Sequence, residues 1–431
     1  MQFLSRWDSQ RLSTTTRGIP LADGLAADDI GRQRWSPSRG DLALPALTLD
    51  EAAFAANRDL FLRWCASAGV SVAPHAKTPM SPELARSLRE AGAWGTTVAN
   101  IQQAAVLLAN GERHLLLANE IGGLAAGRRL GALLSAYPDV ELHAFADSPA
   151  AVAALAEAAR IAGRSELSVL VELGAGRAGA RDRAAVEATI AAVLAADRLV
   201  LGGIATYEGA VATPDAAATM RAIAALMERT IEAFALVRAA APHQPLILSA
   251  GGSAYFDNVA SALAPVARAD GSAMVLLRSG ALFFADHGIY ARAFAELDRR
   301  GGLVIDNARH SAAEGFRPAL TLWAEVLSRP EDGLAIAGFG MRDASFDQGL
   351  PVPLRVFRDG VEQQGLAATL TVTRLNDQHA FLSVASEATL AVGDVIAFGI
   401  SHPCTCLDRW RVIFGLDADG VVTRALPTQF G

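Results

Sequence analysis

The chain has 431 residues, of which 52% are hydrophobic, 19% charged and 6% aromatic, so it can bury a large core and lacks the composition of a disordered protein. Its 38 Lys and Arg against 45 Asp and Glu give a formal net charge of −7, which excludes the basic surface that nucleic-acid binding needs. No apolar run approaches the roughly 18 residues of a membrane span. The start of the chain is charged and lacks a signal-peptide core, and the cysteines are too few for a disulfide framework. We therefore expect a cytoplasmic protein that binds neither nucleic acid nor membrane.

Short apolar runs alternate with Ala-rich stretches of helical period between about Leu44 and Arg292. The expected strands are 46–49, 70–75, 95–98, 114–118, 140–146, 167–173, 201–206, 245–249 and 274–277. The expected helices include 51–68, 82–92, 101–110, 150–162, 184–196 and 213–241. This alternation implies parallel strands with right-handed crossovers, in a closed barrel or an open doubly wound sheet.

We favour the closed (β/α)8 barrel, because about eight units follow one another without a large irregular insertion. The one G-x-G-x-x-G match, Gly174 to Gly179, follows a mid-chain strand instead of the first, which weakens the dinucleotide-binding alternative. After about Gly302 the sequence becomes β-rich, with strands expected at 319–326, 334–337, 368–374, 380–383 and 395–398. We therefore predict an α/β TIM-type barrel over residues 44–302 and a second, β-rich domain over residues 303–431, with residues 1–43 free to lie against either.

Lys77 stands where a predicted strand ends, in Val-Ala-Pro-His-Ala-Lys-Thr, shortly before a helix that Ser81-Pro82-Glu83 would start. In a barrel this places Lys77 at the C-terminal mouth, where catalytic groups lie. A lysine in a desolvated mouth can form a Schiff base. The alternative is a solvated lysine in a loop.

Two turns of small residues follow late strands, at 249–253 (Ser-Ala-Gly-Gly-Ser) and 278–281 (Arg-Ser-Gly-Ala). Glycine lets backbone N–H groups approach a phosphate closely, and late βα loops of barrels commonly bind phosphate. Tight turns also need glycine for their own geometry, so each turn alone is a weak signal. Together with Lys77, the two turns favour pyridoxal 5'-phosphate (PLP) as the cofactor.

The β-rich part contains a further cluster, Ser-His-Pro-Cys-Thr-Cys-Leu-Asp-Arg-Trp at 401–410. On an extended segment, His402 and Cys404 would point to the same side and could bind one zinc ion with open positions for substrate or water. The alternative is a hydrogen-bonded histidine beside a buried thiol. His379 could supply a further ligand or a general base, with a buried, satisfied histidine as the competing interpretation.

Taken together, these motifs resemble the fold-type III PLP enzymes, the alanine racemase-like group, and within it the branch of D-threonine aldolases, D-serine dehydratases and bacterial amino-acid deaminases. The resemblance extends from about Leu44 to the C-terminus. The segments that carry it are 74–78 with 81–85, 172–179, 206–209, 249–253, 277–280, 340–347, 377–379 and 402–404.

The resemblance implies a role for each candidate residue. Lys77 would form the Schiff base, Arg177 and Tyr207 would line the ring or substrate side, and Arg278 would face the pyridine nitrogen. His402 and Cys404 match the metal pair. The phosphate would be held by Ser249, Gly251, Gly252, Ser253, Ser279, Gly280 and Ala281. The resemblance also implies a homodimer in which the β-rich domain of one subunit completes the site of the other.

The second metal ligand bears on the reaction. A Lewis-acid metal near a β-hydroxyl can stabilise departing hydroxide, which leads to a 2-oxo acid and ammonia, whereas deprotonation of that hydroxyl leads to glycine and an aldehyde. The resembled aldolases carry His-x-Asp, while the dehydratases carry His-x-Cys as here, and a thiolate suits Zn²⁺. We therefore expect PLP- and metal-dependent β-elimination of D-3-hydroxy amino acids such as D-serine or D-threonine. The alternatives are retro-aldol cleavage and, less favoured, a non-catalytic PLP-binding protein.

Overall fold

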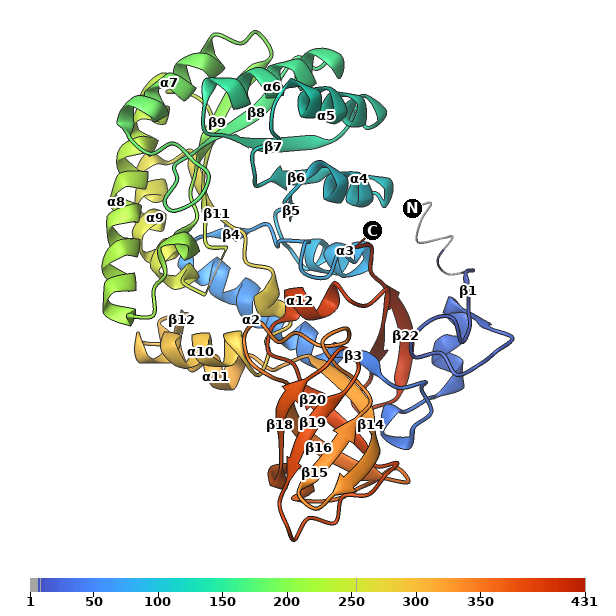
Figure 1. The fold of residues 1–431 in the computed structure, drawn as a ribbon. Helices are drawn as coiled ribbons and strands as arrows, with labels where there is room; N and C mark the ends of the chain where they lie inside the picture. Colours follow the sequence, from blue (N-terminus) through green and yellow to red (C-terminus); the bar gives the residue numbers. More distant parts are fainter. Residues whose placement is uncertain (1–6, 8, 253, 431) are drawn as a thin grey trace.

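The computed structural model describes residues 7, 9–252 and 254–430. Eight parallel strands form one sheet in the spatial order β4-β11-β10-β9-β8-β7-β6-β5. Their bounds are β4 (Ser71–Val72), β5 (Thr96–Val98), β6 (His114–Leu117), β7 (Glu141–Ala146), β8 (Leu167–Glu172), β9 (Leu199–Ala205), β10 (Leu246–Ala250) and β11 (Ala273–Leu277). Figure 1 shows this sheet curled inside a ring of helices.

The two outer strands of this sheet meet. The chain just beyond β4 runs beside β5, where Thr97 N–H donates to Pro74 O (3.0 Å) and Ala76 N–H donates to Thr97 O (2.8 Å), and His75 and Thr97 form a parallel bridge. Side chains from successive strands fill the interior, so the barrel is a packed core; they include Ala73, Leu116, Phe145, Leu170, Ala205, Ile247 and Leu276. The predicted barrel is confirmed.

Helices follow the strands, and most begin at a short polar residue. The side chains of Asn100, Ser148, Asp182 and Asp215 each accept an N–H from the first turn of the helix that they precede, which satisfies a donor that the helix itself leaves unpaired. The helices are α3 (Pro82–Glu90), α4 (Ile101–Ala109), α5 (Leu124–Ala136), α6 (Pro149–Ile161), α7 (Arg183–Leu194), α8 (Ala216–Ala240), α9 (Phe256–Asp270) and α10 (Ile289–Arg299). Among the described residues, no helix is long and apolar enough to cross a lipid bilayer.

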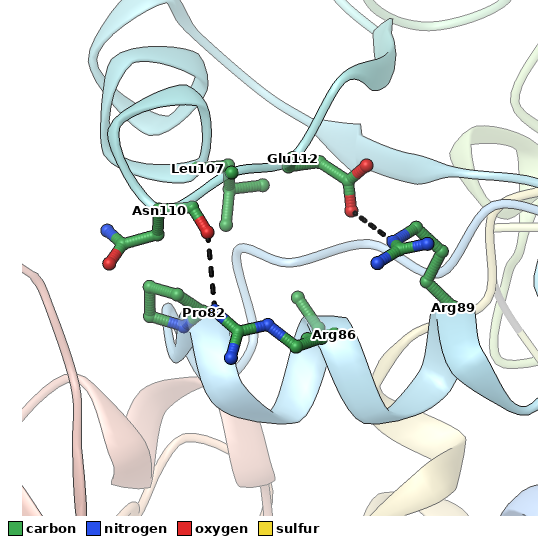
Figure 2. Close-up of a pocket in the computed structure, with 8 residues that line it drawn as sticks. Pro82, Arg86, Arg89, Leu107, Asn110 and Glu112 are labelled. Carbon is green, nitrogen blue, oxygen red and sulfur yellow. Dashed lines mark hydrogen bonds and ion pairs between the residues drawn. The ribbon is translucent and has the colours of Figure 1, made fainter. Parts of the chain in front are cut away.

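Glu112 ties α3 to the point where β6 begins. Its Oε2 accepts from Thr96 Oγ1 (3.0 Å) and lies 3.5 Å from Arg89 Nε, while its Oε1 accepts from the backbone N–H groups of Arg113 (2.9 Å) and His114 (3.2 Å). Figure 2 shows the pocket between α3 and α4 that Arg89 and Glu112 line together with Arg86 and Asn110. Arg86 of α3 also donates to Asn110 O at the end of α4 (3.3 Å), so the polar groups of this pocket join the two helices on the outside of the barrel.

The second unit is a β-sheet whose strands are almost all antiparallel, with the main order β17-β16-β20-β14-β15-β19-β18. It contains β14 (Leu320–Glu331), β15 (Leu334–Ala337), β16 (Val352–Arg358), β17 (Val361–Glu362), β18 (Leu370–Leu375), β19 (Ala380–Val384), β20 (Val395–Gly399), β21 (Val412–Leu416) and β22 (Val422–Pro427). The residues before the barrel belong here, because Leu12, Ile19 and Ile30 are buried with Trp323 and Phe414 of this sheet.

The boundaries of the two units differ from the expected 44–302 and 303–431. The strand β3 (Ala46–Asp50) pairs with β14 and β21 and so lies in the second sheet instead of the barrel. The sequence of a short apolar run does not indicate which of the two sheets the strand joins, because both sheets bury such strands on both faces. Beyond residue 302, β12 (Leu303–Ile305) lies against α2 (Glu51–Ala68), while β13 (Ala308–His310) pairs with β12 and α11 (Ala312–Gly315) lies against α10.

Candidate active site

The mouth of the barrel and one edge of the second unit are joined by backbone hydrogen bonds. His287 N–H donates to Ile400 O (2.9 Å) and Ile289 N–H donates to Ser401 O (3.0 Å). These bonds hold the segment that starts at residue 401 against the chain that leaves β11. The residues with chemical potential from both units therefore meet here.

Lys77 is the only lysine in the chain, and it lies five residues beyond β4 at this mouth. Part of its side chain is open to solvent. Desolvation by the surrounding protein nevertheless lowers the pKa of its ammonium group, opposed by Cys404 and assisted by Arg177 and Arg278. A lowered pKa favours the neutral amine, which is the form that attacks a carbonyl carbon.

Arg278 is a buried cation directly after β11, with 3% of its surface exposed. Its guanidinium donates to Ser249 Oγ and to Thr206 O, both at 2.7 Å, and lies 5.4 Å over the Phe145 ring. Burial lowers the pKa of Arg278, while Glu208 and Glu172 raise it. Within the described chain its contacts are a hydroxyl, a carbonyl and a ring, so its charge is available to an anionic or electron-rich group at the mouth.

The two serines predicted to hold a phosphate are engaged inside the protein. Ser249 Oγ donates to the backbone of β11 (3.0 Å) and accepts from the buried guanidinium, and Ser279 Oγ donates to Gly251 O (2.6 Å). Among the described residues, the backbone N–H groups of Gly252 and Gly280 have no hydrogen-bond partner. Any anion at these turns would therefore meet backbone donors first.

Glycine is required in both turns. Gly251 has φ +73°, a conformation that other residues rarely adopt. A Cβ on Gly280 would lie 2.5 Å from the backbone oxygen of His75, so a side chain there would push the turn away from the lysine segment. Ser253, the remaining predicted phosphate ligand, lies outside the described residues, and Ala281 begins a short 3-10 turn.

Arg177 and Tyr207 form one wall of the mouth. The guanidinium carbon of Arg177 lies 4.6 Å from the centre of the Tyr207 ring, a cation–π contact. Its Nη2 lies 3.7 Å from Oε1 of Glu172, the buried last residue of β8. Burial raises the pKa of Tyr207, and Glu208 raises it further, so the phenol keeps its proton at neutral pH.

A pair of carboxyl groups, not singled out from the sequence, lies behind this wall. Burial raises the pKa of Glu120 to about 8, and a hydrogen bond with Glu172 contributes. Both carboxylate oxygens of Glu120 and Oε2 of Glu172 are buried without another donor among the described residues. A proton shared by the two carboxyl groups accounts for this arrangement. Its only signal in the sequence is that both glutamates stand at or just after the ends of strands.

His402 and Cys404 do not lie on an extended segment as predicted. His402 is extended (φ −158°, ψ 110°), but Pro403 to Leu407 form the short helix α12. Proline is well suited to the first position of a helix, which explains why the chain turns there. The histidine and the cysteine therefore meet across a helix N-terminus instead of along a strand.

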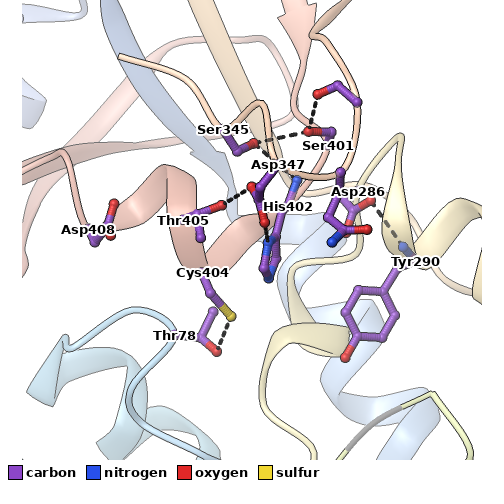
Figure 3. A network of polar contacts seen from close by, with 12 residues as sticks. Thr78, Asp286, Tyr290, Ser345, Asp347, Ser401, His402, Cys404, Thr405 and Asp408 are labelled. Atoms are coloured by element: carbon purple, nitrogen blue, oxygen red, sulfur yellow. Dashed lines mark hydrogen bonds and ion pairs between the residues drawn. The ribbon is translucent and has the colours of Figure 1, made fainter. Parts of the chain in front are cut away.

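Hydrogen bonds hold the imidazole and the thiol in place (Figure 3). His402 Nδ1 lies 2.6 Å from Asp347 Oδ2, and Asp347 Oδ1 accepts from Thr405 Oγ1 at 2.6 Å. Cys404 Sγ lies 3.2 Å from the hydroxyl of Thr78, the residue after the lysine. Burial lowers the pKa of His402, but the neighbouring thiol and carboxylate outweigh it and raise the value to about 9. The pair is therefore an electron-rich site that favours a bound cation.

Asp286 adds an oxygen beside the histidine (Figure 3). Its Oδ1 accepts from the N–H groups of Gly288 (2.6 Å) and Tyr290 (3.1 Å), but its Oδ2 is buried without a partner in the described chain. Burial raises the pKa of Asp286 to about 7, although these N–H groups and His402 lower it. Sequence reasoning missed Asp286, which has no distinctive spacing, and Asp347, which lies within the motif at 340–347.

His379 lies elsewhere. It is exposed at the turn between β18 and β19 and lines a groove with Arg17, Leu44, Leu327 and Asp343. No contact recorded for the described residues joins it to Lys77 or to the His402 pair. Its role as a base stays a prediction.

Comparisons with known proteins agree on the class. Residues 49–275 match the family model of the alanine racemase N-terminal domain, and residues 319–416 match that of a putative serine dehydratase domain. The first match covers more than half of the chain, so the chain belongs to the alanine racemase-like, fold-type III family of PLP enzymes.

Individual relatives lie in the predicted branch. The chain is 29% identical to D-threo-3-hydroxyaspartate dehydratase of Delftia sp. (strain HT23), over 82% of this chain and 89% of that one. It is 26% identical to D-threonine aldolase of Arthrobacter sp, over 83% and 85%. The crystal structure of D-threonine aldolase from Filomicrobium marinum shares the fold, with a TM-score of 0.70 at 24% identity over 90% of this chain and 95% of that one.

Proposed function

We propose that the protein is a PLP- and metal-dependent lyase that removes the β-hydroxyl group of D-3-hydroxy amino acids, such as D-serine or D-threonine, and yields a 2-oxo acid and ammonia. One observation carries the proposal. The imidazole and thiol of the second unit lie over the mouth that holds the chain's only lysine, and Cys404 Sγ is 3.2 Å from the residue next to it. Relatives that carry out dehydration and aldol cleavage of D-hydroxy amino acids support the substrate class.

The mouth fits PLP. Lys77 would hold the cofactor's aldehyde carbon, the backbone N–H groups of Gly252 and Gly280 would face its phosphate, and Arg278 would face its ring nitrogen. Arg177 and Tyr207 would flank the ring or the substrate. Bound PLP would supply an electron sink for the α-carbon of the amino acid.

The second unit fits a divalent metal. His402 offers Nε2, because Asp347 occupies Nδ1 and fixes the ring as such partners do in metal sites. Cys404 offers sulfur, and the unpartnered Oδ2 of Asp286 lies beside them. Nitrogen with thiolate sulfur suits Zn²⁺, which would supply a Lewis acid for the β-hydroxyl. Among solved structures of D-threo-3-hydroxyaspartate dehydratase, a variant in which a cysteine is replaced by alanine is in a metal-free form, and a second variant has alanine in place of a histidine two positions before that cysteine.

The protein's own groups then divide the work. Lys77 would act as the base for the α-proton, and the lowered pKa of its ammonium group favours the neutral amine that this step needs. Arg278 stays charged although buried, because hydrogen bonds and nearby carboxylates hold it. The carboxyl pair of Glu120 and Glu172 keeps Arg177 in place without adding two full negative charges to the mouth.

Product analysis with D-threonine tests the proposal. We expect 2-oxobutyrate and ammonia, measured by keto-acid derivatisation and an ammonia assay, with D-serine giving pyruvate and ammonia. L-threonine and L-serine serve as controls and should give neither product at a comparable rate. Glycine and acetaldehyde as the main products would instead assign the aldolase reaction, the alternative that the D-threonine aldolase relative represents. PLP binding with neither product would favour a non-catalytic PLP-binding protein.

We also propose a homodimer in which His379 acts in the partner's site, since within one chain it lies in a separate groove. Mixing K77A and H379A subunits tests this, because a mixed dimer would then contain one intact site. Each variant alone should be inactive, and the mixture should recover about one quarter of wild-type activity. No recovery on mixing, with mixed dimers demonstrated by differential tags, would contradict a role for His379 across the subunits.

A further inference from the structure

Three side chains with metal-binding atoms meet at the opposite rim of the barrel, where β6 and β7 begin. His114 opens β6 and Glu141 opens β7, and the strand register places them side by side. His143 follows two residues after Glu141, so both point to the same face of the sheet. The proposed active site lies at the carboxyl ends of the strands, so the packed interior of the barrel separates the two places.

The distances suit one ion. Glu141 Oε1 lies 3.3 Å from His114 Nε2 and 3.1 Å from His143 Nε2, and all three atoms lie within 4.8 Å of one another. Zinc bonds of about 2.0–2.1 Å in tetrahedral geometry separate neighbouring ligand atoms by about 3.3–3.4 Å. Two of the three separations are thus close to those of a zinc site.

Two further observations point to a ligand. His114 Nε2 is buried and has no hydrogen-bond partner among the described residues, since its contact with Glu141 lacks hydrogen-bond geometry. His143 Nδ1 lies 2.8 Å from Ser168 Oγ on β8, which orients the ring with Nε2 toward the glutamate. The Nε2 of His143 also lies within hydrogen-bond distance of Glu141 Oε1 (3.1 Å), so His114 Nε2 is the unpartnered nitrogen of the pair. Orientation of a histidine through its second nitrogen, as in His143, is usual for a metal ligand.

An aromatic ring and burial shape the surroundings of the site. The Trp94 ring lies against both histidines, with centroid distances of 3.6 Å to His114 and 5.3 Å to His143. Burial lowers the pKa of His143, which favours the neutral form that binds metals. Burial raises the pKa of Glu141, but the two histidines outweigh burial and lower the pKa below its usual value, so this carboxyl group is ionised.

We propose that His114, Glu141 and His143 bind a divalent transition metal, with Zn²⁺ as the best fit, at the amino-terminal rim of the barrel. Two neutral imidazoles and one carboxylate are an established ligand set for zinc. Glu141 is largely exposed, which leaves room for a water molecule as the fourth ligand. The ion would join β6 to β7 and stabilise the barrel. The amino-terminal end of a barrel contributes to stability, whereas the chemistry takes place at the carboxyl end.

The proposal is tested by measuring the zinc content of the full-length protein in its PLP-bound form. The H402A/C404A double variant removes the proposed mouth site, and we expect it to retain one Zn²⁺ per chain after dialysis and to show a zinc-dependent rise in thermal unfolding temperature. Adding H143A should remove this ion and the temperature shift. E141Q, which keeps the size of the side chain, should weaken binding at least about 10-fold. Substituted Co²⁺ should give the visible absorbance of a low-symmetry site only when the three ligands are intact.

H310A is the matched control, because His310 is an exposed histidine of β13, which pairs with β12 and not with β6 or β7, and it should leave the zinc count unchanged. Circular dichroism of H143A and E141Q checks that the barrel still folds. The proposal is overturned if the H402A/C404A variant binds no zinc at micromolar concentration, or if a folded H143A or E141Q variant binds it as tightly as before. A wild type with a single ion that H143A removes would keep this proposal and contradict the metal at the mouth.

Discussion

Replacement of Lys77 by alanine should abolish covalent attachment of PLP and lower turnover of D-serine by about 10⁴-fold or more, because one side chain is proposed both to hold the cofactor and to serve as the base. The chain makes the measurement unusually direct, since Lys77 is its only lysine. After borohydride reduction, a protease that cleaves after lysine should fail to cut the wild type. Without PLP, the same protease should produce fragments 1–77 and 78–431.

K77R is the matched variant, because it keeps a positive charge at the mouth but its guanidinium cannot form a Schiff base. We expect it to behave like K77A in attachment and turnover. Wild-type protein that retains reduced PLP and is still cut after residue 77 would place the attachment elsewhere, with the α-amino group as the only other amine. Such a result would contradict the proposed role of Lys77 and would leave the proposed metal site unaffected.

The barrel could be predicted from the sequence because its signals are local. Each strand is a short apolar run, each helix has a period near 3.6, and polar caps such as Asn100 and Asp182 stand between them. These features are properties of neighbouring residues and need no knowledge of distant ones. The place of Lys77 followed in the same way, since the end of a barrel strand lies at the mouth wherever the strand occurs.

What the sequence could not show depends on residues far apart in the chain. The contact of Asp347 with His402 joins positions 55 residues apart, and that of Cys404 with Thr78 joins positions 326 residues apart. The pairing of β3 with β14 likewise depends on the fold as a whole. The hydrogen bond between Glu120 and Glu172 forms because the chain after β6 and the end of β8, two strands that β7 separates in the sheet, meet at the mouth of the barrel, and no spacing rule encodes that.

Replacement of Cys404 by alanine should lower turnover of D-serine by about 10²–10³-fold, since a Lewis acid at the leaving hydroxyl supplies several kcal/mol and each 1.4 kcal/mol corresponds to a factor of ten. The visible absorbance of bound PLP should stay unchanged, because the thiol belongs to the second unit and the cofactor is held by the barrel. Treatment of the wild type with a chelator should have the same effect, and added Zn²⁺ should reverse it. Measuring metal content, absorbance and turnover on the same samples separates loss of metal from loss of cofactor.

Cys406→Ala is the control, because this buried thiol contacts the backbone oxygen of Asp343 at 3.9 Å and faces away from the mouth. It should cost some stability and leave turnover near the wild-type level. Cys404→Asp should restore metal binding with a preference for ions that favour oxygen ligands. Full activity in metal-free wild type, or equal losses in the two alanine variants, would show that Cys404 acts only as a packed thiol. In that case the elimination would have to proceed without a Lewis acid at the β-hydroxyl, and the departing hydroxide would need a proton donor from the barrel mouth, where Tyr207 keeps its proton at neutral pH.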